Sequence, residues 1–252
     1  MTLRRTVLIA WMAGSLAVGP GRVPAAAEPD ADATGARQQM VDLVELEASS
    51  LAYETGIATI DPRVLGAMRE VPRHLFVPEV LRPYAYSLQP LPVARDQNIA
   101  APLLIALMTH LAGVQPGDEV FETGTGAGYH AAVLSRLAAH VYSVEVIEPL
   151  ADQAARVLKD LGYGNVEVQA GDGYYGWSAH APYDVIMVKE AIDHLPQPLV
   201  NQLKRGGRLV IPLGPAGGPQ YLTLVRKDQD GRLHQARIMP VHFSPLQGGE
   251  RL

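Results

Sequence analysis

The stretch Val120-Phe-Glu-Thr-Gly-Thr-Gly-Ala-Gly-Tyr-His130 decides the fold. It opens with apolar residues, passes through three glycines at alternate positions, and leads into the apolar-periodic segment 131–137. This order predicts a strand, a tight turn and the start of a helix. Glycines let the backbone bend sharply and let a ligand approach it closely, and the free N–H groups of the helix start form a positive end.

The spacing of these glycines, G-x-G-x-G, differs from the G-x-G-x-x-G of dinucleotide-binding folds and argues against a phosphate site. A second predicted strand, 141–144, leads into Glu145, about twenty residues after the turn, where a carboxylate typically accepts hydrogen bonds from ribose hydroxyls. The turn and the acid together indicate an adenosine-containing cofactor such as S-adenosylmethionine. The alternative is a tight strand-to-helix turn that binds no ligand.

Apolar runs and helical patterns alternate along the chain on both sides of the glycine turn. We expect strands at 118–121, 141–144, 165–169, 183–188 and 207–212, and helices at 102–111, 129–139, 147–161 and 195–203. Two later strands, 221–226 and 233–241, are joined by a hairpin connection at 228–231. The pattern predicts an α/β fold with a doubly wound, mostly parallel sheet, helices on both faces and an antiparallel C-terminal edge.

Ligands of such sheets bind beyond the carboxyl ends of the strands. The glycine turn, Glu145, Asp172 and the segment 189–192 each follow a predicted strand. One crevice is therefore expected to gather them.

Composition limits the other possibilities. The 252 residues include 48% hydrophobic residues and no cysteine, and the net charge is −5. Length and apolar content support one main domain with a sizeable core, and the negative charge disfavours a nucleic-acid partner. Without cysteine there are no disulfides, thiolate metal ligands or thiol nucleophiles, and the scattered histidines show no metal spacing, so no metal site is expected.

The N-terminus has the three-part pattern of an export signal. A basic start is followed by a short apolar run at 6–18 and by the small residues Ala25-Ala-Ala27. This run is too short to span a membrane, and the paired arginines before it weakly resemble a twin-arginine signal. We expect a signal peptide at 1–27, a flexible lead-in at 28–35, and a periplasmic or secreted protein. The alternative is an uncleaved extension on a cytoplasmic protein.

The segment between the lead-in and the glycine turn is expected to form a helical and irregular cap, 36–112, on a cofactor-binding core, 113–252. Asp61 can cap a helix that begins at Pro62. Residues 79–101 lack periodicity, and a long irregular segment of this kind is often functional.

Several longer stretches match one known family. They are Asp61-Pro-Arg-Val-Leu65, Val71-Pro-Arg-His-Leu-Phe-Val-Pro78, Pro90-Leu-Pro-Val93, Glu122-Thr-Gly-Thr-Gly-Ala-Gly-Tyr129, Ser143-Val-Glu145, Gly171-Asp-Gly173 and Gly206-Gly-Arg-Leu-Val-Ile-Pro-Leu-Gly214. On these residues the chain resembles the protein-L-isoaspartate O-methyltransferases, which are Rossmann-like enzymes dependent on S-adenosylmethionine. The resemblance covers nearly all of a single predicted methyltransferase domain, 36–252.

By this resemblance, the S-adenosylmethionine site consists of Glu122, Gly124, Thr125, Gly126, Gly128, Glu145, Val146, Asp172 and Gly173. The glycine turn would hold the methionine part and Glu145 the ribose. Asp172 would accept a hydrogen bond from the adenine amine. For Gly171-Asp-Gly173 taken alone, a plain turn is the alternative.

Two segments on the substrate side of the crevice depart from the family. The family usually reads Gly-Gln-Thr-Ile-Ser-Gln-Pro where this chain has Asp96-Gln-Asn-Ile-Ala-Ala-Pro102, and Thr-Ala-Ala-Pro where it has Lys189-Glu-Ala-Ile192. The family's serine therefore falls on Ala100, which has no hydroxyl. The candidate catalytic residues are Ala100, Asn98 and Glu190, and the candidate substrate-binding residues are Gln97, Asn98, Ile99, Lys189 and Ala191.

Methyl transfer is an in-line displacement for which the protein mainly supplies proximity and alignment. A carboxylate acceptor is already nucleophilic at neutral pH, so losing one hydroxyl costs on the order of 1 kcal/mol. A hydroxyl, amine or thiol acceptor would need a base, which Glu190 or His194 could provide. The alternative is that these are solvated loop groups, with Asp193 capping the next helix.

The expected function is methylation of isoaspartyl carboxylates in damaged proteins, which initiates their repair. One alternative is a methyltransferase of the same fold with another peptide or small-molecule acceptor, and another is a homologue that binds cofactor without turnover. The expected partner is a damaged protein or peptide that bears isoaspartyl. We expect no nucleic-acid partner, no stable membrane association after signal cleavage, and a monomeric state. Because S-adenosylmethionine is made in the cytoplasm, an exported enzyme would have to fold around it before export.

Overall fold

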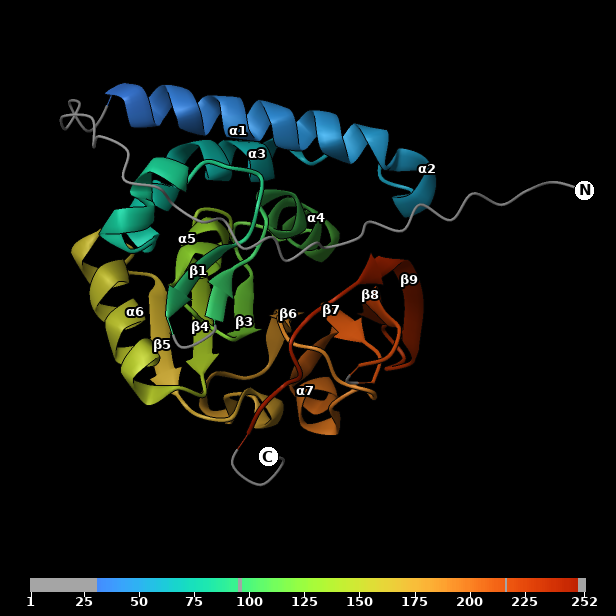
Figure 1. The fold of residues 1–252 in the computed structure, drawn as a ribbon. Helices are drawn as coiled ribbons and strands as arrows, with labels where there is room; N and C mark the ends of the chain where they lie inside the picture. Colours follow the sequence, from blue (N-terminus) through green and yellow to red (C-terminus); the bar gives the residue numbers. More distant parts are fainter. Residues whose placement is uncertain (1–30, 95–96, 216, 249–252) are drawn as a thin grey trace, which may run out of the picture.

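The computed structural model describes residues 31–94, 97–215 and 217–248 (Figure 1). The predicted signal peptide at 1–27 and Asp96 of the substrate segment lie outside the described residues. No helix of the described part is long and apolar enough to cross a membrane.

A seven-stranded sheet forms the centre of the molecule, in the order β5-β4-β3-β6-β7-β8-β9. Its strands are β3 (Glu119–Thr123), β4 (His140–Glu145), β5 (Val166–Ala170), β6 (Tyr183–Met187), β7 (Leu203–Leu213), β8 (Gln220–Lys227) and β9 (Leu233–Val241). Neighbours from β5 to β7 pair in parallel, and β8 pairs antiparallel with both β7 and β9. The predicted mostly parallel sheet with an antiparallel C-terminal edge is confirmed.

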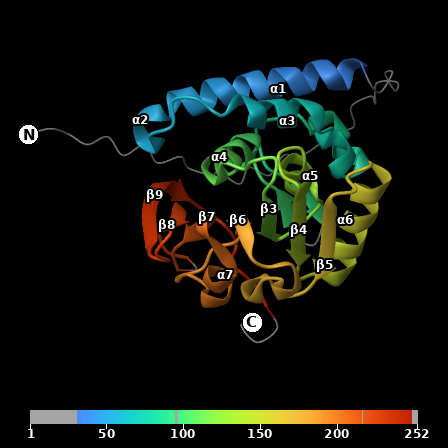
Figure 2. The ribbon, with the colours of Figure 1, turned by 180° about the vertical axis from the view of Figure 1, so that it is seen from behind.

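Helices cover both faces of this sheet (Figures 1 and 2). They are α1 (Ala31–Ser50), α2 (Ala52–Thr55), α3 (Pro62–Glu70), α4 (Pro102–Ala112), α5 (Tyr129–Ser135), α6 (Glu148–Asp160) and α7 (Gln197–Gln202). The core on one face joins α4 and α5 to Val120 and Val141 of the sheet, with α1 and α3 as an outer layer. On the other face, Leu199 of α7 packs with Phe121 and Ile186. This alternation of side chains follows from the period of two along each strand.

The cap before the glycine turn is more regular than expected. It contains the 3-10 helices η1 (Arg73–Phe76) and η2 (Glu79–Tyr84) and an antiparallel hairpin of β1 (Leu91–Ala94) and β2 (Gln97–Ile99). As predicted, Asp61 caps α3 by accepting a hydrogen bond from the Arg63 amide.

The structure corrects the boundaries of three elements. The lead-in predicted to be flexible up to residue 35 is helical from Ala31, because α1 is anchored by buried residues such as Met40 and Val44, and a helix extends cheaply once formed. Helix α5 ends at Ser135 rather than near 139. Strand β7 begins at Leu203, with the expected Gly206 turn absorbed as an irregularity in its pairing with β6.

Candidate functional site

The glycine turn between β3 and α5 depends on backbone conformations that favour glycine. Gly124, Gly126 and Gly128 have φ angles of +63°, +56° and +90°. A Cβ at Gly128 would lie 3.1 Å from the Leu158 side chain, so this glycine also lets α6 pack closely. A Cβ at Gly124 would collide with the carboxyl group of Glu190. The turn thus exposes bare backbone, as a closely bound ligand requires.

Glu145 lies directly against this turn, as its place at the end of β4 predicts. Its Oε2 accepts a hydrogen bond of 2.9 Å from the Gly126 amide, and its Oε1 accepts one of 3.1 Å from the Ile147 amide. The residue is buried, whereas Val146 after it is exposed. Glu145 is therefore an acidic group fixed beside the glycine turn, the position that the sequence predicts for it.

A buried polar network ties β3 to β4 behind the turn. The Thr125 and Ser143 hydroxyls are 2.6 Å apart, and Ser143 donates to Glu122 Oε1 at 2.7 Å. The other Glu122 oxygen lies 2.8 Å from Lys189 Nζ. Because Glu122 is fully buried, this cation offsets the cost of holding its charge away from water.

The loop after β6 brings two charged residues to the turn. The Lys189 amide donates to Thr123 Oγ1 at 3.1 Å, and this hydroxyl in turn donates to Glu190 Oε2. The pKa of Glu190 is raised to about 7, chiefly by burial; the hydrogen bond from Thr123 and the charge of Lys189 lower it, and the carboxylates of Glu145 and Glu122 raise it. The Glu190 carboxyl can therefore change charge near neutral pH.

The loop after β5 lies against the end of β3. Asp172 Oδ1 accepts from the Tyr174 amide at 2.9 Å and so caps the 3-10 helix η3 (Gly173–Tyr175). A Cβ at Gly173 would lie 2.7 Å from the Thr123 side chain, so this loop packs tightly on the end of β3. The plain-turn role considered for this segment is present, and its position beside the glycine turn also suits an adenine wall.

The loops that follow β5 and β6 contact each other through Tyr174 and His194. The Tyr174 hydroxyl lies 3.1 Å from His194 Nε2, and His194 Nδ1 lies 2.6 Å from Asp193 Oδ1. The hydrogen bond with His194 is the main cause that lowers the pKa of Asp193. Asp193 does not cap α7, because that helix begins later, at Gln197, with Pro196 as its cap residue.

The substrate segment, residues 96–102, is held by Arg73 and β1 and not by the glycine turn. Asn98 is exposed on β2, and Ile99 is buried. The Ala100 carbonyl accepts a 3.0 Å hydrogen bond from Arg73 Nη2, while Arg73 Nε donates to the Ala85 carbonyl at 3.0 Å. Within the described residues, the hydrogen bonds of the segment run to β1, to Arg73 and, at the Ala101 carbonyl, to the Ile105 amide of α4, and none reaches the glycine turn.

Sequence reasoning did not single out Arg73 as a functional residue. It is fully buried, with its guanidinium 4.9 Å from the centre of the Tyr129 ring. Burial lowers the pKa of Arg73. The signal was an arginine inside the mostly apolar stretch Val71-Pro-Arg-His-Leu-Phe-Val-Pro78, whose resemblance to the family is more specific than that of the glycine turn.

The segment 189–192 is fixed from both sides. The Ala191 amide donates to the Ser244 carbonyl and the Leu246 amide donates to the Ala191 carbonyl, both at 2.8 Å. Ile192 forms a bridge with Leu213 at the end of β7. Ala191 is itself buried, so its contribution here is made through its backbone.

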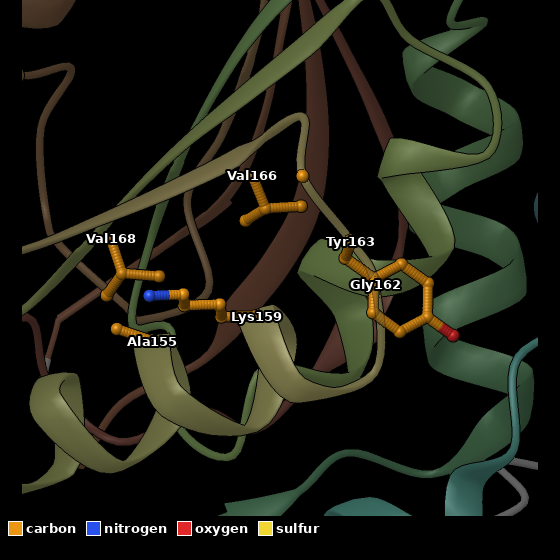
Figure 3. Close-up of a pocket in the computed structure, with 7 residues that line it drawn as sticks. Ala155, Lys159, Gly162, Tyr163, Val166 and Val168 are labelled. Carbon is orange, nitrogen blue, oxygen red and sulfur yellow. The ribbon is translucent and has the colours of Figure 1, made fainter.

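Cavities lie against α6. One of about 320 Å³ lies between α6 and the outer strand β5, lined by Ala155, Lys159, Gly162, Tyr163, Gly164, Val166 and Val168 (Figure 3). A smaller apolar one, of about 150 Å³, touches the glycine turn at Ala127 and the hairpin at Val93. Among the described residues, no group of three or more acidic or histidine side chains could hold a metal ion.

Comparison with known sequences places the chain among named relatives. The family model described as protein-L-isoaspartate(D-aspartate) O-methyltransferase matches residues 50–251. Protein-L-isoaspartate O-methyltransferase 1 of Cupriavidus necator is 50% identical over 212 residues, which cover 84% of this chain and 82% of that protein. Protein-L-isoaspartate O-methyltransferase 2 of Syntrophobacter fumaroxidans is 48% identical over 235 residues, or 93% and 94%.

Solved structures show the same fold. One named protein-L-isoaspartate O-methyltransferase matches with a TM-score of 0.73 and 29% identity, over 84% of this chain and 66% of that one. A beta-aspartate methyltransferase from Plasmodium falciparum, solved in complex with S-adenosyl-L-homocysteine, matches with a TM-score of 0.68 over 84% of this chain and 99% of that one. At 21% identity, this second likeness supports the fold alone.

Proposed function

The chain belongs to the protein-L-isoaspartate(D-aspartate) O-methyltransferase family, which depends on S-adenosylmethionine, and we propose that it methylates the carboxylate of isoaspartyl residues in damaged proteins. The observation that carries the proposal is the glycine turn with Glu145 bonded to its Gly126 amide, at the crevice predicted for the cofactor. Sequence identity to relatives of that name, over most of both chains, supports the acceptor.

The residues of the crevice fit this cofactor. Bare backbone at Gly124 and Gly126 suits its methionyl end, the Glu145 carboxylate suits the ribose hydroxyls, and Asp172 with Gly173 suits the adenine. The cofactor supplies a methyl group already activated on a sulfonium. The protein has only to align donor and acceptor and to exclude water.

The acceptor side asks for little chemistry. An isoaspartyl carboxylate is ionised at neutral pH and attacks without a general base. The alanine at position 100 therefore removes one hydrogen bond to the acceptor, but it does not remove a group that the reaction requires. The backbone of Ala100 is still held in place by Arg73, so the substrate segment keeps a defined position without the hydroxyl.

A second acceptor class is favoured by one observation, the charged pair Lys189 and Glu190 in the loop after β6. The pKa of Glu190 is raised to about 7, which would suit a base for a hydroxyl, amine or thiol acceptor. We weigh this below the isoaspartyl acceptor because Glu190 lies against the cofactor turn.

Radiolabelled methyl transfer tests the proposal. The purified protein is incubated with methyl-labelled S-adenosylmethionine and either an isoaspartyl peptide or the matching aspartyl peptide, with a native cell extract in parallel. We expect base-labile label on the isoaspartyl peptide alone. Label that appears only on components of the extract would refute the isoaspartyl acceptor and support the second acceptor class.

We further propose that the protein is exported, and that it folds around its cofactor first. The support is the basic start, the apolar run and the small residues at 25–27. Cell fractionation followed by N-terminal sequencing tests this. A cytoplasmic protein that retains residues 1–27 would disprove it.

A further inference from the structure

The loop after β6 places a carboxyl group over the glycine turn. Glu190 Oε1 occupies the space that a Cβ of Gly124 would fill, and Glu190 Oε2 accepts a hydrogen bond from Thr123 Oγ1. Gly124 has a φ of +63° and no side chain, so its backbone is open toward this carboxyl. The same open backbone is the place where the turn can meet the methionyl end of the cofactor.

Negative charge in this corner of the crevice exceeds positive charge. Among the described residues whose charges act on Glu190, Lys189 is the one cation, against the carboxylates of Glu145 and Glu122. Lys189 Nζ is already 2.8 Å from Glu122 Oε2. His130 adds no charge here, because burial, and then Lys189, lowers its pKa well below the ordinary value. The corner therefore favours a ligand that brings a positive hydrogen-bond donor.

We propose that Glu190 binds the α-ammonium group of the cofactor's methionyl end and thereby orients the methyl donor. Of the two cationic groups on S-adenosylmethionine, the ammonium donates hydrogen bonds and the sulfonium does not. A carboxylate held by Thr123 at the end of β3 is a suitable acceptor for it, and charge-assisted hydrogen bonds of this kind are short and strong. The inference rests on the proposed function, since it requires this cofactor in the glycine turn.

The position of Glu190 argues against a role as the base for the acceptor. Its carboxyl is bonded to Thr123 and abuts Gly124, both on the cofactor turn. The substrate segment is held instead through Ala100 and Arg73. Glu190 is thus a positioning residue for the donor, and its effect should appear in binding before any acceptor is present.

Calorimetry with two ligands isolates the contact. S-adenosylhomocysteine carries the amino-acid end with its ammonium, whereas methylthioadenosine shares the nucleoside and the thioether but lacks that end. The variant Glu190→Gln removes the charge and keeps an oxygen to accept from Thr123, so the fold is retained. Glu79→Gln, the same change at an exposed residue of η2, is the matched control. Thermal unfolding of all three proteins checks that each is folded.

We expect Glu190→Gln to bind S-adenosylhomocysteine about 10- to 100-fold more weakly than the wild type, as the loss of a charge-assisted hydrogen bond predicts. Its affinity for methylthioadenosine should change by less than about 2-fold, because this ligand has no ammonium group to contact Glu190. Glu79→Gln should match the wild type with both ligands.

Proton release provides a second readout that a purely structural role would not produce. Because the pKa of Glu190 is about 7, the carboxyl is partly protonated near neutral pH, and an ammonium ligand should drive the proton off. Binding of S-adenosylhomocysteine at pH 7, repeated in buffers of different ionisation enthalpy, should show this release in the wild type. It should be absent in Glu190→Gln and absent with methylthioadenosine.

Three results would overturn the inference. Equal losses for both ligands would mean that Glu190 only shapes the turn, and unchanged binding would mean that it makes no contact. Tighter binding to Glu190→Gln would mean that the carboxyl competes for the space. A wild-type protein that binds neither ligand would refute the proposed function itself, which the methyl-transfer assay checks separately.

Discussion

Replacing Gly124 by alanine should destabilise the protein in a way that depends on Glu190. The substitution puts a Cβ at a φ of +63°, which costs about 1–2 kcal/mol. The new Cβ also collides with the Glu190 carboxyl, which must turn away and lose its hydrogen bond from Thr123, for about 1 kcal/mol more. The expected total is about 2–3 kcal/mol of unfolding free energy.

Gly126→Ala is the matched control for the backbone cost. Gly126 has nearly the same φ, +56°, but its Cβ would meet only the Gly124 carbonyl oxygen, at 3.9 Å. It should therefore cost about 1–2 kcal/mol, from the backbone alone. Placing Gly124→Ala in a Glu190→Ala background removes the colliding carboxyl, so there its cost should fall to the same level.

Urea denaturation of the wild type, the single variants and the double variant measures these differences, provided that the slope of the transition stays constant. The collision predicts a coupling of about 1 kcal/mol between positions 124 and 190, above the roughly 0.3–0.5 kcal/mol scatter of independent sites. If Gly124→Ala costs the same in both backgrounds, the carboxyl does not lie over the turn, and the inference about the ammonium group loses its geometric basis.

Three further outcomes follow from the same contacts. In Arg73→Lys, a lysine cannot reach both carbonyl groups that the guanidinium binds, so the variant should lower the unfolding free energy by about 2–4 kcal/mol in urea titrations. The control Arg69→Lys disturbs a more exposed ion pair and should cost under about 1 kcal/mol. Lys189→Met leaves the buried Glu122 carboxylate without its cation and should cost about 3 kcal/mol in the same assay. The folded-state pKa of Glu190 is raised to about 7, so the folded protein holds the proton of this carboxyl more tightly than the unfolded chain does. The protonated carboxyl therefore contributes its full share to the unfolding free energy below the unfolded-state pKa, and that share is lost as pH rises toward and through 7. Stability followed from pH 5 to 8 should therefore fall by on the order of 1–3 kcal/mol more in the wild type than in Glu190→Gln.

The grouping of Gly124, Glu145 and Asp172 around the glycine turn could be predicted because its signals are local. The positive φ angles of Gly124 and Gly126 need glycine, and the end of β4 sits beside them through parallel pairing of adjacent strands. The place of Glu145 then follows from strand order alone. Strand order likewise predicts that Asp172, which follows β5, lies near the glycine turn. The sequence could not distinguish a capping role for Asp172 from a binding role, and the structure shows that it caps η3.

The substrate half could not be predicted in this way, because its contacts join parts of the chain that carry no mutual signal. Residues 79–101 looked irregular, yet they form η2 and the β1–β2 hairpin around the buried Arg73. A single arginine that satisfies two carbonyls leaves no periodicity for sequence reasoning to detect. The flexible lead-in was misjudged for a similar reason, since α1 is fixed by packing rather than by its composition.

The segment 189–192 shows how the two halves are connected. It leaves β6, bridges to the end of β7 at Leu213, and is held at Ala191 by the backbone of Ser244 and Leu246. The position of Glu190 over the glycine turn therefore depends on three segments: β6, the end of β7 and residues 244–246. Because these segments are far apart in the sequence, the residue type at position 190 alone could not have indicated that position. Lys189 and Glu190 both contact the end of β3 beside the glycine turn. Under the proposed function, the departure of this segment from the family would therefore affect the methyl donor at least as much as the acceptor. Tests of specificity should accordingly begin with the binding of the cofactor.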